Sequence, residues 1–352
     1  MLSVIKINQP EEWDSIVKSF TDYDVYYLSG YTKAFQLHGD GEPLLFYYNT
    51  DDFRAINVVM KRDIARDSHF NGKLESGTHF DLSTPYGYGG FLIEGTVTDS
   101  NITKLDEAYS SYCSGNHIVS EFVRFHPVNR NADVNKKIYD VTDLGNTVTV
   151  DLSSKEQIWD NLSSKNRNVI RKAMKSGVTV HCGNSPDLLD DFIRLYEQTM
   201  RKDNATPYYY FSREFYISVL EDLKGNMTFF YAVFEEKIIS MSMILFGNRK
   251  MHYHLSASDQ NYQYMAAGNL MLHEAACWGC ENGLQSFHLG GGVGSGEDGL
   301  YKFKKAFNRN SDTVFSIGKK IFDKEKYDRL IDLRAQEENF NCMNSYFPCY
   351  RG

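Results

Sequence analysis

The sequence has few cysteines, no long apolar run and no secretory signal. Six cysteines in 352 residues are too few for a disulfide framework, so reduced thiols are the simpler interpretation. No apolar stretch approaches the roughly 18 residues that a membrane span needs. Residues 1–11 lack the basic and then apolar layout of a signal peptide. We therefore expect a cytoplasmic chain without a membrane span, which leaves only peripheral contact with a membrane open.

Basic residues are outnumbered by acidic ones. The chain carries 38 Lys and Arg against 46 Asp and Glu, a formal net charge of −8. This balance argues against DNA as a partner, although it leaves room for a small basic patch that binds a phosphate. Hydrophobic residues at 42% and charged residues at 24% are typical of a globular protein. A length of 352 residues favours two domains.

One basic patch lies in a predicted helix that a serine at position 163 or 164 can cap. Five cations occur in it without an acid: Lys165, Arg167, Arg171, Lys172 and Lys175. Arg167 and Arg171 are one helical turn apart, so their guanidinium groups could bind one phosphate or carboxylate of a substrate. The alternative is the ordinary solvated face of a basic helix.

The same order of predicted elements occurs twice. In the first half, strands at residues 43–48 and 55–61 precede a turn-rich segment at 81–90, a helix at 102–114 and a strand at 118–125. In the second half, strands at 227–234, 237–246 and 251–256 precede a helix at 265–282 and a strand at 285–289. Further helices are predicted at 155–176, 186–202 and 212–223. The halves join near 145–151, and a capping box is predicted at 153–156.

Several segments together resemble the FemABX family of GNAT-fold aminoacyltransferases. Their order and spacing carry the resemblance: DLSTPYGYGG at residues 81–90, EFVRFHP at 121–127, KNRNVIRKA at 165–173, and LGGG at 289–292 running into GLYKFK at 299–304. The resemblance implies an α/β (α+β) fold of two tandem GNAT-like domains, each a mixed, mostly antiparallel sheet flanked by helices. We predict these domains at residues 1–147 and 148–352, with the acyl-transfer site in the second.

The resemblance also implies a reaction. Family members transfer an aminoacyl group from aminoacyl-tRNA to an amine of a cell-wall precursor, without a metal or a tightly bound cofactor. We therefore expect an amine-bearing cell-wall or polysaccharide precursor and the acceptor end of tRNA as partners. The co-substrate is aminoacyl-tRNA or acyl-CoA. Two other hypotheses stay open: an acyl-CoA-dependent acetyltransferase acting on an amino sugar or amino acid, and an inactive double-GNAT binding scaffold.

A donor site is implied where two strands of a GNAT fold diverge, here at residues 251–256 and 285–289. The helix between them begins near four small or polar residues: Ala266, Ala267, Gly268 and Asn269. The first amides of a helix have no partner within it, so they favour an anionic phosphate of coenzyme A or of tRNA. The alternative is that these small residues serve close packing.

Lys304 is the strongest single candidate for catalysis. It follows Phe303, and this Phe-Lys pair matches the family, where the lysine is implicated in stabilising charge on the transition state or the leaving group. A cation at developing negative charge contributes a few kcal/mol in a dry site. Asp81 is a further catalytic candidate. The alternative for Lys304 is an exposed helical lysine beside Lys302 and Lys305.

Acceptor or proton-handling roles are predicted for a further set. Alternation along a strand places His252 and His254 on one face and Tyr253 on the other. Arg124 and His126 are expected to pair with an aromatic loop at 86–90. The substrate-binding set is Arg167, Arg171, Tyr86, Tyr88, Arg124, Tyr253, His254 and Tyr301.

Three further motifs match functional patterns but have ordinary structural alternatives. The glycines at 294, 296 and 299 match a dinucleotide fingerprint but lie in a long loop and not in a tight first turn. Cys277 and Cys280 form a Cys-x-x-Cys pair near a helix C-terminus, where the dipole opposes thiolate formation, so structural cysteines are favoured. His273 shares their helix face, but no fourth zinc ligand is evident. The aromatic tail at 339–352 is expected to pack on its own domain or on a neighbour.

Overall fold

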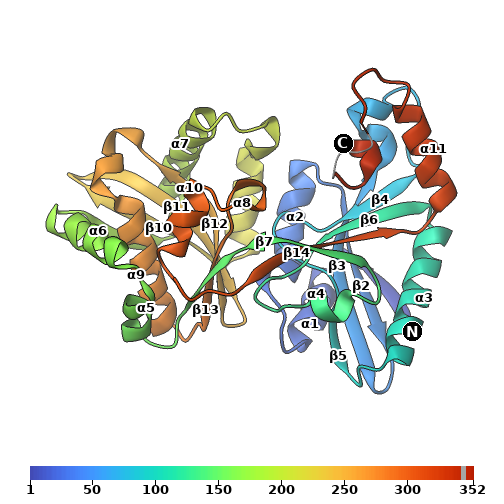
Figure 1. Cartoon of the computed structure of the whole chain (residues 1–352), viewed down its shortest axis with the longest axis horizontal. Helices are drawn as coiled ribbons and strands as arrows, with labels where there is room; N and C mark the ends of the chain where they lie inside the picture. Colours follow the sequence, from blue (N-terminus) through green and yellow to red (C-terminus); the bar gives the residue numbers. More distant parts are fainter. Residues whose placement is uncertain (342–345) are drawn as a thin grey trace. The chain divides into compact units, whose positions relative to one another are not determined.

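The computed structural model describes residues 1–341 and 346–352, which form two compact units (Figure 1). The first unit comprises Met1–Leu144 and Phe315–Gly352, and the second comprises Gly145–Val314. The predicted join near residue 147 thus lies close to the observed boundary at residues 144 and 145. The assignment of all of 148–352 to one domain is corrected, since residues 315–352 belong to the first unit. The reason is a late strand, β14 (Val314–Ile321), which lies between β6 and β7 in the sheet of the first unit.

The first unit is built on an eight-stranded sheet. Its strands are β1 (Leu2–Lys6), β2 (Glu42–Asn49), β3 (Phe53–Asp63), β4 (Phe80–Ser83), β5 (Leu92–Gly95), β6 (Ile118–Arg124), β7 (Asp140–Asn146) and β14. The helices are α1 (Pro10–Ser19), α2 (Ser29–His38), α3 (Asp99–Gly115), α4 (Ala132–Asn135) and α11 (Lys324–Arg334). The strand order is β1-β2-β3-β4-β6-β14-β7, with β5 paired to β3.

The second unit is built on a six-stranded sheet in the order β8-β13-β12-β11-β10-β9. Its strands are β8 (Val148–Asp151), β9 (Thr179–Gly183), β10 (Met227–Phe234), β11 (Lys237–Gly247), β12 (Lys250–Ser258) and β13 (Ser286–Gly290). The helices are α5 (Lys155–Asn161), α6 (Ser164–Lys175), α7 (Pro186–Lys202), α8 (Arg213–Asp222), α9 (Ala267–Glu281) and α10 (Gly299–Lys305).

The predicted repeat is confirmed. In the first unit β4 and β6 are parallel and are connected through α3, and in the second β12 and β13 are parallel and are connected through α9. Antiparallel strands precede each crossover, β2 and β3 in one unit and β10 and β11 in the other. Each unit therefore has the mixed sheet with flanking helices that the sequence predicts.

Helices cover both faces of the second sheet. Phe229 packs its ring 5.0 Å from that of Phe192 on α7, whereas Phe230 packs 5.6 Å from Trp278 on α9. Because neighbouring residues of a strand point to opposite faces, α7 and α9 cover opposite sides of this sheet. Among the residues that the structure describes, no helix combines the length and the apolar character that a membrane crossing needs.

Local sequence explains where the elements turn or break. Glu235 and Glu236 have φ of 46° and 63°, and Asn248 and Arg249 have 45° and 62°, as tight turns of two antiparallel hairpins require. The single helix predicted at 155–176 is corrected to two, because Leu162 is extended and Ser163 caps α6 through its hydroxyl. The predicted capping box is also shifted, since the serine at position 154, and not 153, caps α5.

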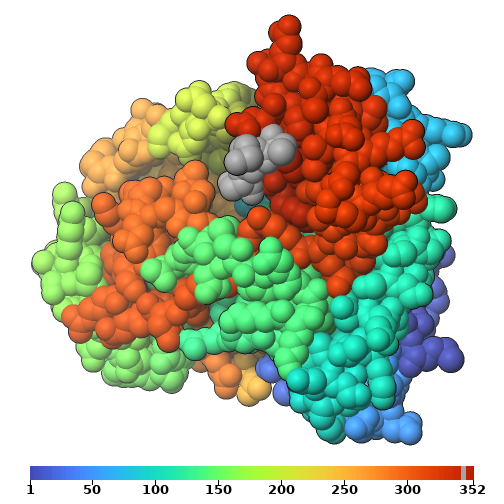
Figure 2. All heavy atoms as spheres, turned by 45° about the vertical axis from the view of Figure 1, so that its right-hand side comes forward, coloured from blue at the N-terminus to red at the C-terminus, as the bar shows by residue number. Residues whose placement is uncertain are grey.

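The C-terminal tail packs on its own unit. Tyr350 is fully buried in an apolar cluster with Ile64, Phe70 and Tyr327. In Figure 2 the red C-terminal segment lies against the blue segment that carries residues 64–70. Residues 342–345 of the predicted aromatic tail lie outside the described residues.

Candidate active site

Two central strands of the second unit diverge at the predicted donor site. β12 and β13 pair only through Lys250, Met251 and His252, opposite residues 286–288. Beyond His252, β12 stays paired with β11, while β13 pairs with β8. In the part of the chain that the structure describes, no strand is paired with this edge of β12 after His252. The pairing of β12 with β13 therefore ends where the donor site is predicted.

A β-bulge lies at this divergence, and sequence reasoning missed it. Ile244 is opposite Tyr253 and Met243 is opposite Leu255, so His254 is the extra residue on β12. Bulges re-aim side chains and often lie beside active sites. Burial, with the neighbouring His252 adding to it, lowers the pKa of His254 to about 3. His254 is thus a neutral imidazole at neutral pH, suited to hydrogen bonding more than to taking a proton.

The helix that follows this divergence begins without a side-chain cap among the described residues. Its N-cap residue, Ala266, has a left-handed backbone with φ of 53°, which is uncommon for a residue other than glycine. Gly268 has open space beside it, since an added Cβ would meet only the Ser240 hydroxyl, at 3.8 Å. The amides of Ala266 and Asn269 already donate to the carbonyl oxygens of Gln263 and Ala266, each at 3.1 Å, so the predicted set is narrowed to the amides of Ala267 and Gly268, which a phosphate could approach.

Lys304 is buried, so the alternative of an exposed helical lysine is excluded. Its side chain is 8% exposed, and it lies on the core-facing side of α10 together with Tyr301. Its ammonium donates a 2.7 Å hydrogen bond to the carbonyl oxygen of Gly291, one residue after β13. Lys302, in contrast, is exposed. The lysine is thus held at the end of one of the two diverging strands.

The environment of Lys304 favours catalysis by a cation. Burial lowers its pKa to about 8, and the nearby Asp298 carboxylate opposes that effect. Asp298 itself is fixed, because it caps α10 at the amide of Tyr301 and accepts from the amide of Val293. At neutral pH Lys304 therefore keeps its charge in a largely dry site, where a cation interacts strongly with developing negative charge.

One apolar cluster brings the second-unit candidates together. Tyr301 and Ala267 belong to it, and Phe303 and Tyr253 pack against it. Burial raises the pKa of Tyr253, which is consistent with a neutral hydroxyl beside the diverging strands. The start of α9, the middle of β12 and the core-facing side of α10 therefore pack around the same cluster.

The two arginines of the basic helix make contacts within the unit. Arg167 donates to the carbonyl oxygen of Leu162 at 3.0 Å and lies near other carbonyls at the end of α5. The guanidinium of Arg171 stacks 5.0 Å from the ring of Trp159. The exposed lysines of α6 differ, because within the described ranges their ammonium groups form neither a hydrogen bond nor an ion pair. These are Lys165, Lys172 and Lys175.

Asp81 lies in the first unit and is completely buried there. Its carboxylate accepts from Arg62 at 2.8 Å, from Arg351 at 2.6 Å and from the hydroxyl of Tyr350 at 3.0 Å. Burial raises the pKa of this carboxyl, but the two guanidinium groups outweigh it and hold the pKa below its ordinary value. This arrangement favours a structural role, in which Asp81 ties the C-terminal residues to β3 and β4.

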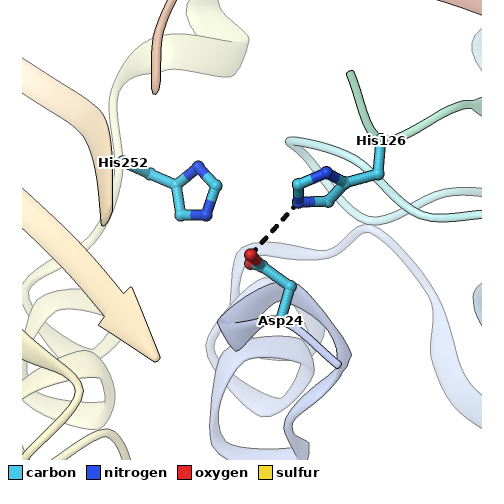
Figure 3. Close-up of side chains that lie close together, drawn as sticks. All are labelled: Asp24, His126 and His252. Carbon is cyan, nitrogen blue, oxygen red and sulfur yellow. Dashed lines mark ion pairs between the residues drawn. The ribbon is translucent and has the colours of Figure 1, made fainter. Parts of the chain in front are cut away.

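The expected pairing of Arg124 and His126 with the aromatic loop is confirmed. Arg124 lies 5.5 Å from the ring of Tyr86, and His126 lies 5.8 Å from the ring of Tyr88. His126 also forms an ion pair with Asp24, with 3.2 Å between Nε2 and Oδ2, which Figure 3 draws with a dashed line. The loop needs its glycines, since a Cβ on Gly90 would lie 2.7 Å from the ring of Phe125.

The Cys-x-x-Cys motif and its neighbours have ordinary structural surroundings. Burial, followed by the charge of Glu274, raises the pKa of Cys277 to about 11, so the thiol form dominates at neutral pH. Burial also lowers the pKa of His273 to about 4. Its ring packs 5.2 Å from that of Trp159. These groups favour the structural interpretation that the sequence suggested.

Comparisons with known proteins agree with this geometry. Residues 163–305 match the family described as "Acetyltransferase (GNAT) domain". The UDP-N-acetylmuramoylpentapeptide-lysine N(6)-alanyltransferase of Weissella viridescens is 30% identical over 173 residues, which cover 48% of this chain and 50% of that protein. The chain therefore matches about half the length of this curated relative.

Solved structures extend the likeness to both units. The crystal structure of FemX has a TM-score of 0.68 at 14% identity, covering 93% of this chain and 99% of that one. A conserved protein of unknown function from Bacteroides thetaiotaomicron has a TM-score of 0.57 at 14% identity, covering 91% and 99%. Together with the GNAT domain and the alanyltransferase, these likenesses confirm the resemblance to the FemABX family, and the fold of this chain is that of two tandem GNAT-like units.

Proposed function

We propose that this protein is a FemABX-type N-acyltransferase that transfers an aminoacyl group from aminoacyl-tRNA to an amine of a cell-wall precursor. The observation that carries the proposal is the buried Lys304 ammonium at the end of β13, beside the divergence of β12 and β13. The alanyltransferase relative supports the acceptor class, since by its name it modifies the lysine of a UDP-N-acetylmuramoylpentapeptide. The reaction belongs in the cytoplasm, where charged tRNA and such precursors meet.

The chemistry is one acyl transfer. The neutral acceptor amine attacks the carbonyl carbon of the aminoacyl ester, and a C–N bond forms as the carbonyl oxygen becomes an oxyanion. The C–O bond to the terminal ribose of tRNA then breaks, and the proton lost by the amine ends on that ribose hydroxyl. In this proposal the protonated Lys304, whose ammonium is bound to the Gly291 carbonyl, stabilises negative charge on the oxyanion or the leaving oxygen. No metal or tightly bound cofactor takes part.

Two features of the second unit favour an anionic donor. The first turn of α9 offers backbone amides beside the diverging strands. The exposed lysines of α6 add a positive surface, and α6 packs directly on α9. The phosphates near the 3′ end of a tRNA match both features. We therefore assign the α6 lysines, rather than Arg167 and Arg171, to contact with the donor.

A second candidate is transfer from an acyl-CoA. The description of the matching family favours it, because that domain is named for acetyl transfer. The diphosphate of coenzyme A would suit the same helix start. Attack by the amine would then break a thioester, with the proton passing to the departing thiolate.

Transfer assays separate the candidates. Purified protein is offered alanyl-tRNA in one reaction and a panel of acyl-CoAs in another, each with a lysine-containing UDP-N-acetylmuramoylpentapeptide, and amide products are read by mass spectrometry. We expect an alanyl adduct from tRNA alone. Product from acyl-CoA alone would identify acyl-CoA as the donor and support the second candidate. No product from either donor would favour the inactive binding scaffold.

A further inference from the structure

A buried asparagine joins the two helices of the proposed site. Asn166 is in the first turn of α6, and its side chain is only 2% exposed. Burial of an amide costs free energy unless its donors and acceptor are paired. Its neighbours in the sequence, Lys165 and Arg167, are charged, so the sequence itself gives no sign that this position is in the core.

The side chain of Asn166 is paired in two directions. Its Nδ2 donates to the carbonyl oxygen of Ala306 at 3.3 Å, directly after the last residue of α10. Its Oδ1 accepts from Nδ2 of Asn269 at 2.8 Å, in the first turn of α9. The amide of Ser163 donates to the same Ala306 carbonyl at 2.9 Å. One side chain thus links the end of the helix that carries Lys304 to the start of the helix at the donor site.

We infer that Asn166 is a positioning residue, which sets the distance between the Lys304 ammonium and the first-turn amides of α9. This inference rests on the proposed function and deepens it. Ala306 is two residues after Lys304, so a shift at Ala306 is passed along the short helix α10 to the ammonium. Asn269 is likewise next to Gly268, whose amide belongs to the proposed donor site.

The physical argument is one of alignment. Acyl transfer needs the Lys304 ammonium at the reacting carbonyl while the first turn of α9 holds the donor. A misplacement of about 1 Å costs on the order of 100-fold in rate. Asn166→Ala removes the acceptor of Asn269 and one of two donors to Ala306, while Ser163 still caps α6 and still bonds Ala306. The helices should therefore stay folded while their relative position becomes less defined.

The test compares Asn166→Ala with a matched control in the alanyl-tRNA assay. Asn161→Ala removes another buried asparagine, at the end of α5, which accepts a 3.1 Å hydrogen bond from Asn310 and whose side chain has no hydrogen bond to α9 among the described residues. We expect Asn166→Ala to lower kcat about 10- to 100-fold with KM for the donor changed less than threefold. Asn161→Ala should lose similar thermal stability but keep kcat within about threefold.

A second pair of measurements keeps the inference independent of folding defects. Asn269→Ala breaks the same link from the other helix, and in the double variant the loss of kcat should be no larger than in Asn166→Ala alone. Equal loss of kcat in Asn166→Ala and Asn161→Ala, or full additivity in the double variant, would overturn the inference. If the wild type is active and Asn166→Ala has the same kcat, the inference fails while the proposed function stands. A wild type that transfers nothing overturns the proposed function and this inference together.

Discussion

The Nζ of Lys304 lies 2.7 Å from the carbonyl oxygen of Gly291, and this contact fixes a cation at the end of β13. A lysine that served only solubility would point into water, as Lys302 does on the same helix. Burial of the ammonium is unfavourable for folding, which is consistent with the catalytic role that we propose for Lys304.

Lys304→Met should separate activity from stability. We expect kcat to fall about 100- to 1,000-fold, because one preorganised donor to a developing oxyanion is worth this much. The melting temperature at pH 7 should stay the same or rise, since the variant removes a buried charge. Lys302→Met is the matched control and should change neither property. A Lys304→Met enzyme of normal activity would contradict the assigned role.

The pH dependence of the wild type follows from the lowered pKa of Lys304. Its pKa is about 8 in the folded chain, against an ordinary value of 10.5. Since the reaction needs the protonated form of Lys304, the ratio of kcat/KM for the wild type to that for Lys304→Met should fall as the pH rises through about 8, and the titration of the acceptor amine cancels from this ratio. Stability should change in the opposite direction. Between pH 8 and 10.5 the unfolded chain binds more protons at Lys304 than the folded chain does, so the free energy of unfolding of the wild type should rise with pH relative to that of Lys304→Met. Matched rate profiles and thermal melts of both proteins measure this.

Gly268→Asp should weaken donor binding without unfolding the protein. The added carboxylate lies in the first turn of α9, where it favours the helix but repels a phosphate. We expect KM for the donor to rise about tenfold or more, with an unchanged melting temperature. Gly268→Ala is the steric control, because its Cβ would meet only the Ser240 hydroxyl at 3.8 Å. Equal donor KM in both variants would argue against an anion at this helix start.

Replacing the three exposed lysines of α6 by serine should weaken contact with tRNA. Binding of each phosphate releases counterions, so the variant should show lower affinity and a shallower dependence of affinity on salt. The measurement is a titration with uncharged tRNA at several salt concentrations. An unchanged salt slope would remove α6 from the donor surface.

Asp81→Asn should destabilise the fold by about 1.5–3 kcal/mol, because Arg62 and Arg351 lose the buried carboxylate that they share, while Arg351 keeps its ion pair with Asp67. Denaturant unfolding measures this loss. Activity per folded molecule should stay within about threefold of the wild type. A loss of activity in a fully folded variant would instead restore Asp81 as a catalytic candidate.

Sequence reasoning found the elements whose signals are local. Hairpin turns, a serine cap at position 163 or 164 and the strand, helix and strand order at β12, α9 and β13 all follow from neighbouring residues. The Phe303-Lys304 pair came from a resemblance and not from periodicity. The burial of Lys304 could have been suspected, since Tyr301 and Lys304 are three residues apart and share one face of α10.

Features that depend on distant parts of the chain could not be predicted in this way. The bulge at His254 requires the register of β11 against β12, and the burial of Asn166 requires Asn269 and Ala306. The role of Asp81 depends on Arg351, which is far away in the sequence. Sequence reasoning also predicted no strand at β14, so the return of the chain to the first sheet was missed.

The return of β14 has a consequence for how the chain is made. During synthesis residues 1–144 emerge first, but their sheet lacks a strand between β6 and β7 until residues 314–321 have been added. The second unit, residues 145–314, is continuous and can complete its own sheet before that point. The later-synthesised unit is therefore the first that can finish folding on the ribosome, and the earlier one must keep the neighbouring edges of β6 and β7 unpaired until then.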